Sequence, residues 1–309
     1  KNYDYLESLE NINSVNSNNL PKLDAVYGFT NTDKPNIGYE SDEAVASIAL
    51  SYNLFNGFKD ISLKESSKYL SLSSQHGLNA TKQDIVLNTK TAYINYLDKK
   101  NALETYNSAY ILFQEQYEDS KHRYEQGLIA KNDLLQVQVN MSNAKQNVVK
   151  AQGDLKISSF TLSNILGGMD LSKEKIEDLD EKSLQSFTYN EELLENRSEI
   201  QALLLNLKSI KELEKSTNSG YYPKIDATVS HNKYFDELSK KVEDKQENQN
   251  IAKINATWNL YNGGYDSSQN AIYKTKYLSA TSLLNKTKLD IKLQYENAKS
   301  NLKVSSENL

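Results

Sequence analysis

The chain has 309 residues, enough for about two domains of ordinary size, and its composition excludes several classes of protein. Its net charge of −5, without a block of basic residues, argues against a nucleic-acid partner. These residues include no cysteine, so they offer no disulfide, thiolate metal site or cysteine nucleophile. The mean hydropathy is −0.69, and no run approaches the roughly 18 apolar residues of a membrane helix, although transmembrane strands give only a weak signal.

Residues 1–19 form a lead segment. No signal peptide is visible at Lys1, as expected of either a cytoplasmic protein or a mature, processed chain. Residues 20–56 predict a β-hairpin, because apolar and polar side chains alternate with a period of two. The apolar side of these two strands reads Leu23, Ala25, Tyr27, Phe29 and then Ala46, Ile48, Leu50, Tyr52, Leu54. The other side carries Lys22, Asp24 and then Val45, Ser47, Ala49, Ser51, Asn53. Each strand has about 10 to 12 residues, close to the length that crosses a bilayer at a tilt.

Residues 57–166 predict a helical hairpin. Between positions 59 and 126 there is no proline and only Gly77, so a single helix of about 100 Å is expected. The return helix, residues 131–166, has a coiled-coil seam with a period of about 3.5 residues. The seam consists of Leu134, Val137, Met141, Ala144, Val148, Ala151, Leu155, Ser158, Leu162 and Ile165. A soluble coiled-coil hairpin also accounts for this segment.

Residues 167–190 predict a charged connector that opens with Gly167 and Gly168, which would end the preceding helix in the left-handed conformation. Residues 191–219 predict another helix, expected to be unbroken from Glu191 to Ser216. Placed end to end, the helices at 131–166 and 191–216 nearly match the long first helix in length. This comparison predicts a rod with a small belt of connector at the join.

Residues 220–262 predict a second β-hairpin, and residues 263–309 a second long helix that stops before any return. The apolar side of this hairpin reads Ile225, Ala227, Val229 and then Ala252, Ile254, Ala256, Trp258, Leu260. The polar side reads Lys224, Asp226 and then Lys253, Asn255, Thr257, Asn259.

The chain contains an internal repeat of two copies. The residues Ser-Tyr-Asn-Leu-Phe-Asn-Gly at 51–57 return as Thr-Trp-Asn-Leu-Tyr-Asn-Gly at 257–263, about 206 residues later. Pro-Lys-Leu-Asp-Ala at 21–25 returns as Pro-Lys-Ile-Asp-Ala at 223–227, at a spacing of about 202. Each copy therefore runs strand, loop, strand, long helix.

Two interpretations of the four strands stay open at this point. A sheet packed on a core is the general expectation for alternating strands. A membrane sheet is favoured because the rest of the chain is coiled-coil-like and because aromatic residues, including Tyr27, Tyr52, Tyr221, Tyr222 and Trp258, lie where interfacial aromatics would lie. Strand edges cannot stay open in lipid, and four strands are too few to close a barrel, so chains would have to associate. A trimer would supply twelve strands.

No arrangement of residues predicts an enzyme, a metal or a cofactor. His76, His122 and His231 are far apart in sequence and lack ligands at metal spacing. The glycine pairs at 167–168 and 263–264 are followed by no P-loop lysine. We therefore expect no catalytic, metal-binding or cofactor-binding residues.

Several motifs resemble the TolC-like outer-membrane efflux proteins. Two of them, Asn-Leu-Phe-Asn-Gly at 53–57 and Asn-Leu-Tyr-Asn-Gly at 259–263, each open a long helix. The third is Arg-Tyr-Glu-Gln-Gly-Leu-Ile-Ala-Lys-Asn-Asp-Leu-Leu at 123–135, at the helix-hairpin tip. The others are the end of the return helix at 162–167 and Arg-Ser-Glu-Ile-Gln-Ala at 197–202. The resemblance runs from about residue 20 to 309. It departs from the family in a short lead segment and in a second repeat that lacks its return helix.

The resemblance implies a mixed α and β fold. A homotrimeric twelve-stranded transmembrane β-barrel, four strands per chain, is continued by an α-helical coiled-coil barrel in the periplasm. It also implies a passive exit duct in the outer membrane, working with a periplasmic adaptor and an inner-membrane pump in efflux or type I secretion. The alternative is a soluble structural or adhesin-like coiled-coil protein with a small β head.

Three sets of site residues follow. The helix-hairpin tip is a predicted adaptor contact, formed by Arg123, Tyr124, Gly127, Leu128, Ile129 and Asp133; an ordinary helix turn is the alternative. The predicted lumen-lining residues are Lys22, Asp24, Asn53, Lys224, Asp226, Asn255 and Asn259. The predicted lipid-facing residues are Ile48, Leu50, Tyr52, Leu54, Ile254, Trp258 and Leu260.

Overall fold

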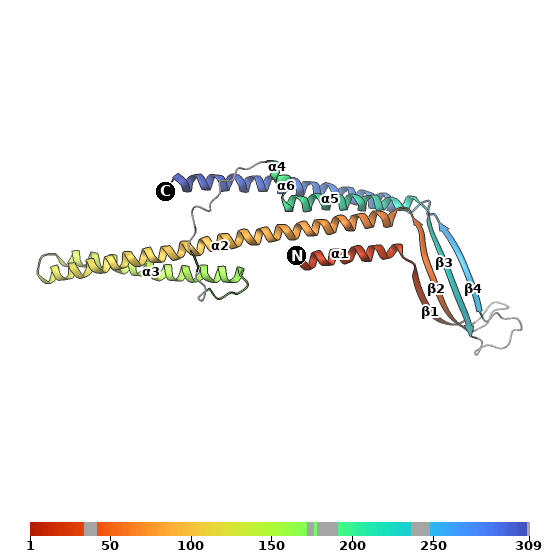
Figure 1. The fold of residues 1–309 in the computed structure, drawn as a ribbon, viewed down its shortest axis with the longest axis horizontal. Helices are drawn as coiled ribbons and strands as arrows, with labels where there is room; N and C mark the ends of the chain where they lie inside the picture. The colour runs from red at the N-terminus through yellow and green to blue at the C-terminus, as the bar shows by residue number, and fades with distance from the viewer. Residues whose placement is uncertain (34–41, 172–175, 178–190, 236–247, 308–309) are drawn as a thin grey trace. The chain divides into compact units, whose positions relative to one another are not determined.

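A computed structural model describes residues 1–33, 42–171, 176–177, 191–235 and 248–307 of the chain (Figure 1). The chain divides into two compact units, the first formed by Lys1–Ala80 with Tyr189–Leu309 and the second by Thr81–Thr188. The predicted fold class is confirmed, since the chain combines long helices with one four-stranded antiparallel sheet. Among the described residues, no helix combines the length and the apolar character needed to cross a membrane.

The sheet belongs to the first unit and has the strand order β1-β2-β3-β4. Its members are β1 (Lys22–Asn31), β2 (Asp42–Asn56), β3 (Lys224–Phe235) and β4 (Asn248–Thr257), each antiparallel to its neighbour. The two predicted hairpins therefore lie side by side, joined by the β2–β3 pairing. A β-bulge between Asn53 and Phe55 places Leu54 as an extra residue in β2. Because β1 and β4 are edge strands, the sheet is open at both sides.

The strands continue into helices at one end of the sheet (Figure 1). A short helix, α1 (Asn2–Asn16), and the turn η1 (Ser17–Asn19) lead into β1, and β2 continues into α2 (Lys59–Glu125). In the second repeat, α5 (Ser198–Thr217) and η4 (Asn218–Tyr221) lead into β3, while α6 (Tyr265–Glu307) follows β4. The lead segment is thus mostly helical.

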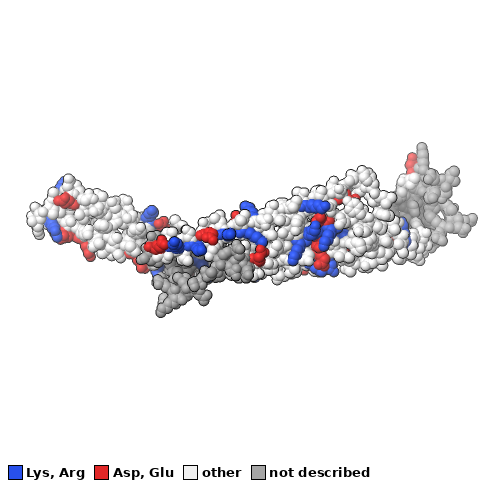
Figure 2. Space-filling view, turned by 90° about the horizontal axis from the view of Figure 1, so that it is seen from above, with Lys and Arg blue, Asp and Glu red and all other residues white. Residues whose placement is uncertain are grey.

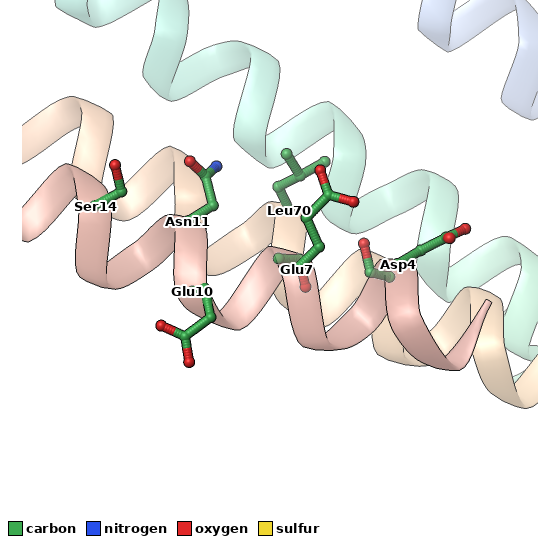
Figure 3. Close-up of a pocket in the computed structure, with 8 residues that line it drawn as sticks. Asp4, Glu7, Glu10, Asn11, Ser14 and Leu70 are labelled. Atoms are coloured by element: carbon green, nitrogen blue, oxygen red, sulfur yellow. The ribbon is translucent and has the colours of Figure 1, made fainter.

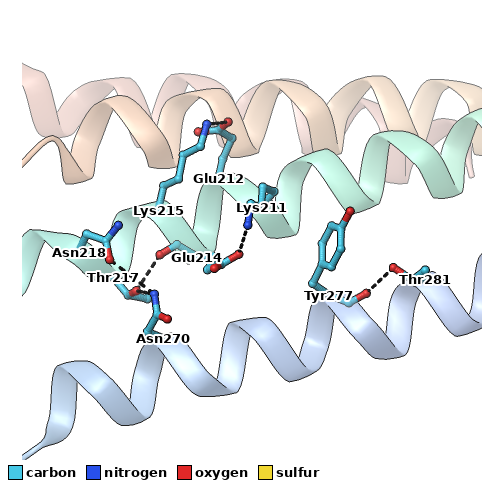
Figure 4. Close-up of polar contacts among 9 residues, drawn as sticks. All are labelled: Lys211, Glu212, Glu214, Lys215, Thr217, Asn218, Asn270, Tyr277 and Thr281. Carbon is cyan, nitrogen blue, oxygen red and sulfur yellow. Dashed lines mark hydrogen bonds and ion pairs between the residues drawn. The ribbon is translucent and has the colours of Figure 1, made fainter.

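Helices α5 and α6 pack through an apolar core. Its buried members are Ile200, Leu207, Leu284 and Ile291, and Ile200 is fully buried. Polar contacts extend this interface toward the sheet, where Asn270 Nδ2 donates to Thr217 Oγ1 at 3.2 Å (Figure 4). On α5, Lys215 Nζ donates to Glu212 at 2.6 Å, and this hydrogen bond raises the pKa of the Lys215 ammonium.

Serine side chains lie at the contacts of α2 with α1 and α5. Ser66 and Ser209 are buried, and their hydroxyl oxygens lie 2.9 Å apart. Ser8 Oγ donates to Ser71 Oγ at 3.2 Å, and Ser73 Oγ donates to the Ala202 carbonyl at 2.7 Å. Small side chains that bond to each other allow helix backbones to approach closely. These contacts hold the helices that carry the four strands.

The second unit is a helical hairpin of the C-terminal part of α2 and α3 (Lys131–Ile165). The predicted coiled-coil seam of α3 is confirmed, because all ten of its residues are buried or half-buried. Gly167 and Gly168 both have positive φ, 78° and 89°, and they follow the helix as predicted. Beyond them, Tyr93 donates a hydrogen bond to the Glu177 carbonyl.

Two predicted boundaries are wrong. The helix expected from Glu191 to Ser216 is broken into α4 (Glu191–Glu195) and α5, because Arg197 takes an extended conformation with ψ of 139°. Strand β4 ends at Thr257, so Trp258, Asn259 and Leu260 follow the strand instead of continuing it. Most of the predicted connector, 172–175 and 178–190, lies outside the described residues.

Candidate functional surfaces

One face of the sheet gathers the apolar positions of all four strands. Directly opposed residues in antiparallel strands point to the same face, and the register aligns Leu23, Leu50, Val229 and Ala252 in one row across the sheet. A second row aligns Tyr52, Ala227 and Ile254. The apolar stripes that alternation predicts for separate segments therefore form one continuous surface.

This apolar face is exposed in the single chain. The exposed fraction is 55% for Ile48, 39% for Tyr52 and 73% for Ile254. Every residue of β1 and β4 is exposed. A soluble protein rarely leaves a contiguous apolar surface of this kind uncovered, so the face requires an apolar environment or a partner.

Aromatic residues lie at both ends of the apolar face. At the end near the helices, the rings of Phe55, Phe58 and Tyr222 contact each other edge to face, with centroids 5.1 to 6.4 Å apart. At the far end, the centroids of Tyr27 and Phe235 lie 6.2 Å apart, and Lys233 Nζ lies 5.5 Å from the Phe235 centroid. Aromatic rings with a neighbouring lysine suit the boundary between water and lipid.

The opposite face of the sheet carries most of the predicted lumen-lining residues. Asn53 Nδ2 donates to Asp226 Oδ1 at 2.8 Å, and Lys224 Nζ lies 3.0 Å from Asp226 Oδ2. Asn255 is directly opposite Asp226 in the register. Lys22 and Asp24 lie on this face of β1, opposite Ser51 and Ala49. Asn259 lies beyond β4, where its Oδ1 accepts a hydrogen bond from the Tyr261 N–H.

The junction from strand to helix has the same backbone form in both repeats. Gly57 and Phe58 have φ of 67° and 65°, and their repeat equivalents Gly263 and Gly264 have φ of 59° and 80°. Phe58 is the only described residue other than glycine with positive φ. This conformation bends the chain where each strand passes into its helix.

Close packing at these junctions explains two glycines. A Cβ on Gly57 would lie 2.8 Å from the Ser219 Cα and carbonyl oxygen, and one on Gly220 would lie 2.2 Å from Asp266 Oδ1. Asp60, the repeat equivalent of Asp266, is buried and accepts a hydrogen bond from Asn56 Nδ2. Asp60, Gly220 and Asp266 were not among the residues predicted from the sequence, although the first-turn aspartate recurs at the repeat spacing.

The helix-hairpin tip is in the second unit, between α2 and α3. Gly127 has φ of 73°, and the Leu128 N–H donates to the Arg123 carbonyl at 2.8 Å. Asp133 Oδ2 accepts from the Ala130 N–H at 3.2 Å and caps α3. The structure leaves Leu128 68% exposed. The tip is therefore a tightly bonded turn that presents an apolar side chain.

Elsewhere the surface of the helices carries polar and charged side chains. A shallow pocket of about 550 Å³ lies between α1 and α2 and is lined by Asp4, Glu7 and Glu10 together with Leu70 (Figure 3). On the face drawn in Figure 2, basic and acidic side chains lie intermixed along the helices. The described residues contain no group of three His, Asp or Glu side chains that could hold a metal ion.

Comparison with known proteins assigns the family. The sequence profile of the outer membrane efflux proteins matches residues 6–168, more than half of the chain. The chain belongs to the outer membrane efflux protein family. The TolC outer membrane proteins of Vibrio cholerae and Escherichia coli K12 are each 24% identical to it, over 282 and 277 residues. These alignments cover 89% and 85% of this chain but 64% and 56% of the relatives, so the chain spans less than two thirds of their length.

The fold of this efflux-family chain also has solved counterparts. The Campylobacter jejuni CmeC outer membrane channel superposes with a TM-score of 0.79 at 19% identity, covering 96% of this chain and 68% of that one. At this identity the likeness concerns the fold, which is the predicted combination of strands and long helices.

Proposed function

We propose that this chain is the subunit of a passive exit duct in the cell outer membrane. Three copies would close a twelve-stranded β-barrel around a polar lumen, and their helices would continue as a coiled-coil tube in the periplasm. Cargo would move by conduction through the lumen, with gating by relaxation of the helices at the periplasmic end.

The observation that carries the proposal is the exposed apolar face of an open sheet. Unpaired N–H and C=O groups at a strand edge cost several kcal/mol each in hydrocarbon, so a four-stranded sheet can enter lipid only after its edges pair with other copies. Three copies supply twelve strands. Ile48, Tyr52 and Ile254 would then contact acyl chains, while Asn53, Asp226 and Asn255 would line water.

The partners follow from the lack of an energy source. A passive duct needs a periplasmic adaptor and an inner-membrane pump, as the resemblance to the family implies. The tip residues Arg123 to Asp133 are the proposed adaptor contact, because an exposed leucine at a rigid turn offers an apolar anchor. The cargo would be that of an efflux or type I secretion system.

The alternative is a soluble coiled-coil protein with a β head. Single-channel recording in planar lipid bilayers distinguishes this alternative from the membrane duct. The detergent-solubilised protein should insert and give discrete single-channel steps, and it should sediment as a trimer. A protein that stays monodisperse without detergent and leaves the bilayer silent would be the coiled-coil alternative.

A further inference from the structure

The two repeats differ at the end of their second strand, and the difference has a structural cause. Strand β2 continues to Asn56, whereas the repeat-equivalent β4 ends at Thr257, which corresponds to Ser51. The residues at 258–262 are thus the counterparts of the last five residues of β2. Their sequence, Trp-Asn-Leu-Tyr-Asn, closely matches Tyr-Asn-Leu-Phe-Asn at 52–56.

The partner strand decides this difference. Strand β1 begins at Lys22, opposite Ser51, so β1 offers no partner to residues 52–56. These residues are held as a strand by β3 alone, in pairs that run from Tyr52 opposite Ala227 to Asn56 opposite Lys224. Strand β3 in turn begins opposite Thr257 and cannot pair with residues 258–262. In the single chain, the β4 extension has no strand beside it.

The internal repeat identifies the missing strand. In the order β1-β2-β3-β4, β2 of the first repeat pairs with β3, the opening strand of the second repeat. The repeat equivalent of that contact joins β4 to β1, the opening strand of the first repeat. Both are edge strands of one sheet and are separated by β2 and β3, so β1 must come from a second copy of the chain.

We infer that residues 258–262 become a strand on assembly by pairing with β1 of a second copy, in the register of the β2–β3 pairing. This inference rests on the proposed trimer and adds its register. Asn53 opposite Asp226 becomes Asn259 opposite Asp24 of the second copy. Phe55 opposite Ile225 becomes Tyr261 opposite Leu23 of the second copy, with a bulge at Leu260 that repeats the bulge at Leu54.

Polar groups on this edge match the inferred register. Within the chain, Asp226 accepts a hydrogen bond from Asn53 at 2.8 Å and lies 3.0 Å from Lys224 Nζ. The repeat places the same three residue types at the junction between copies, as Asn259 with Asp24 and Lys22 of the second copy. In the single chain Asn259 Oδ1 accepts from the Tyr261 N–H. In the assembly its Nδ2 would donate to Asp24 of the second copy, as Asn53 Nδ2 donates to Asp226.

The glycine at the junction gives independent support. Gly57 packs against the backbone of Ser219 and the Cβ of Tyr222, where a turn is closed by the Tyr222 N–H bonding to the Ser219 carbonyl at 3.1 Å. The counterpart Gly263 has the same positive φ but has nothing within 4 Å of a Cβ position. The counterpart turn is present, with the Leu20 N–H bonded to the Ser17 carbonyl at 3.1 Å. The space at Gly263 fits this turn from the second copy.

Cysteine pairs test the register, because these 309 residues contain no cysteine. Opposed residues in antiparallel strands have Cα atoms about 4.5 to 5.5 Å apart, which suits a disulfide. The double variant Asp24→Cys with Asn259→Cys is produced in cells and purified as the assembled protein. The protein is then oxidised in its detergent-solubilised state. We expect a covalent trimer on a denaturing gel, which reductant returns to monomer.

Two matched pairs serve as controls. Asp24→Cys with Asn255→Cys uses the same strands and residue types but is four residues out of register, and it should give at least about fivefold less linked product. Asn53→Cys with Asp226→Cys reproduces the geometry within one chain and should form a bond without linking copies. If this internal pair oxidises while the 24–259 pair does not, or if the 24–255 pair links as well as the 24–259 pair, the register is wrong.

Sedimentation of the unsubstituted protein separates this inference from the proposed function. A trimer that fails to link through positions 24 and 259 overturns the inferred register and leaves the duct intact. A monomeric protein overturns both.

Discussion

Gly220 lies against the carboxylate of Asp266, so that a Cβ at position 220 would be 2.2 Å from Asp266 Oδ1. This contact joins the turn before β3 to the first turn of α6 and fixes where the second repeat leaves the sheet. Gly57, just before α2, packs against the same turn, where a Cβ would lie 2.8 Å from the Ser219 Cα and carbonyl oxygen. Both glycines therefore determine the spacing between strands and helices.

Alanine at these glycines should destabilise the protein to different degrees. Gly57→Ala combines a clash with rigid backbone and a positive φ, so we expect a loss of about 3 kcal/mol or more in the free energy of unfolding. Gly220→Ala, which meets a movable side chain, should cost about 1 to 3 kcal/mol. Urea unfolding of the detergent-solubilised protein, followed by circular dichroism, measures both.

Two other glycines separate strain from clash in that experiment. Gly127 has positive φ but open space around it, so Gly127→Ala should cost only about 1 to 2 kcal/mol. Gly153 in α3 has neither constraint, so Gly153→Ala should be neutral or stabilising. Equal effects at positions 57 and 127 would show that packing at the junction contributes nothing.

The two faces of β4 should respond oppositely to a charge. Ile254 lies on the apolar face and Ile251 on the polar face, where Ile251 is opposite Ser230. An arginine facing the middle of the lipid costs about 2 to 4 kcal/mol per chain, whereas one in a water-filled lumen costs little. Ile254→Arg should therefore reduce the amount of folded trimer in the outer membrane, and Ile251→Arg should not. Quantitative immunoblots of unheated membrane samples measure the amount of folded trimer. If Ile251→Arg reduced this amount and Ile254→Arg did not, the assignment of the lumen to the Ile251 face would be wrong.

Charge on the polar face should change ion selectivity. Asn255→Lys would add one positive charge per chain beside Asp226, shifting the reversal potential in a salt gradient toward anion selectivity. Its free energy of unfolding should stay within about 0.5 kcal/mol of the parent value, as for a surface change. The matched variant Asn250→Lys lies on the other face, opposite His231, and should leave selectivity unchanged.

The helix-hairpin tip should be dispensable for folding but needed for transport. Leu128 is exposed, so Leu128→Asp should leave the circular dichroism spectrum and the single-channel conductance unaltered. It should reduce cargo export by cells that carry the complete system, since an apolar anchor is lost. Asp133→Ala, which removes the cap of α3, should instead lower stability by about 1 kcal/mol. Normal export by the Leu128 variant would argue for an ordinary helix turn.

Periodicity in the sequence was sufficient for the main elements. The alternation around Ile48 and Ile254 predicts strands whose apolar residues the register places on one face. The heptad spacing from Ala144 to Leu162 predicts residues that are buried in α3. Both patterns are local, because a strand or a helix seam is written in consecutive residues.

Features that depend on residues distant in sequence could not be predicted from local periodicity. The end of β4 at Thr257 depends on a partner strand and not on its own alternation, which continues to Leu260. The break at Arg197 has no proline or glycine to mark it. The role of Gly220 depends on Asp266, which is remote from it in sequence and becomes a neighbour only in the folded chain.

Trp258 offers the most direct test of whether the apolar face meets lipid. It is the sole tryptophan of the 309 residues and is 59% exposed at the helix end of the sheet. The protein is reconstituted in vesicles whose acyl chains carry bromine at a shallow or a deep position, and the Trp258→Phe variant supplies the background. The account predicts strong quenching of the Trp258 fluorescence, greater with shallow bromines than with deep ones. Fluorescence that bromolipids leave unchanged would show that this face is covered by protein and would contradict the membrane duct.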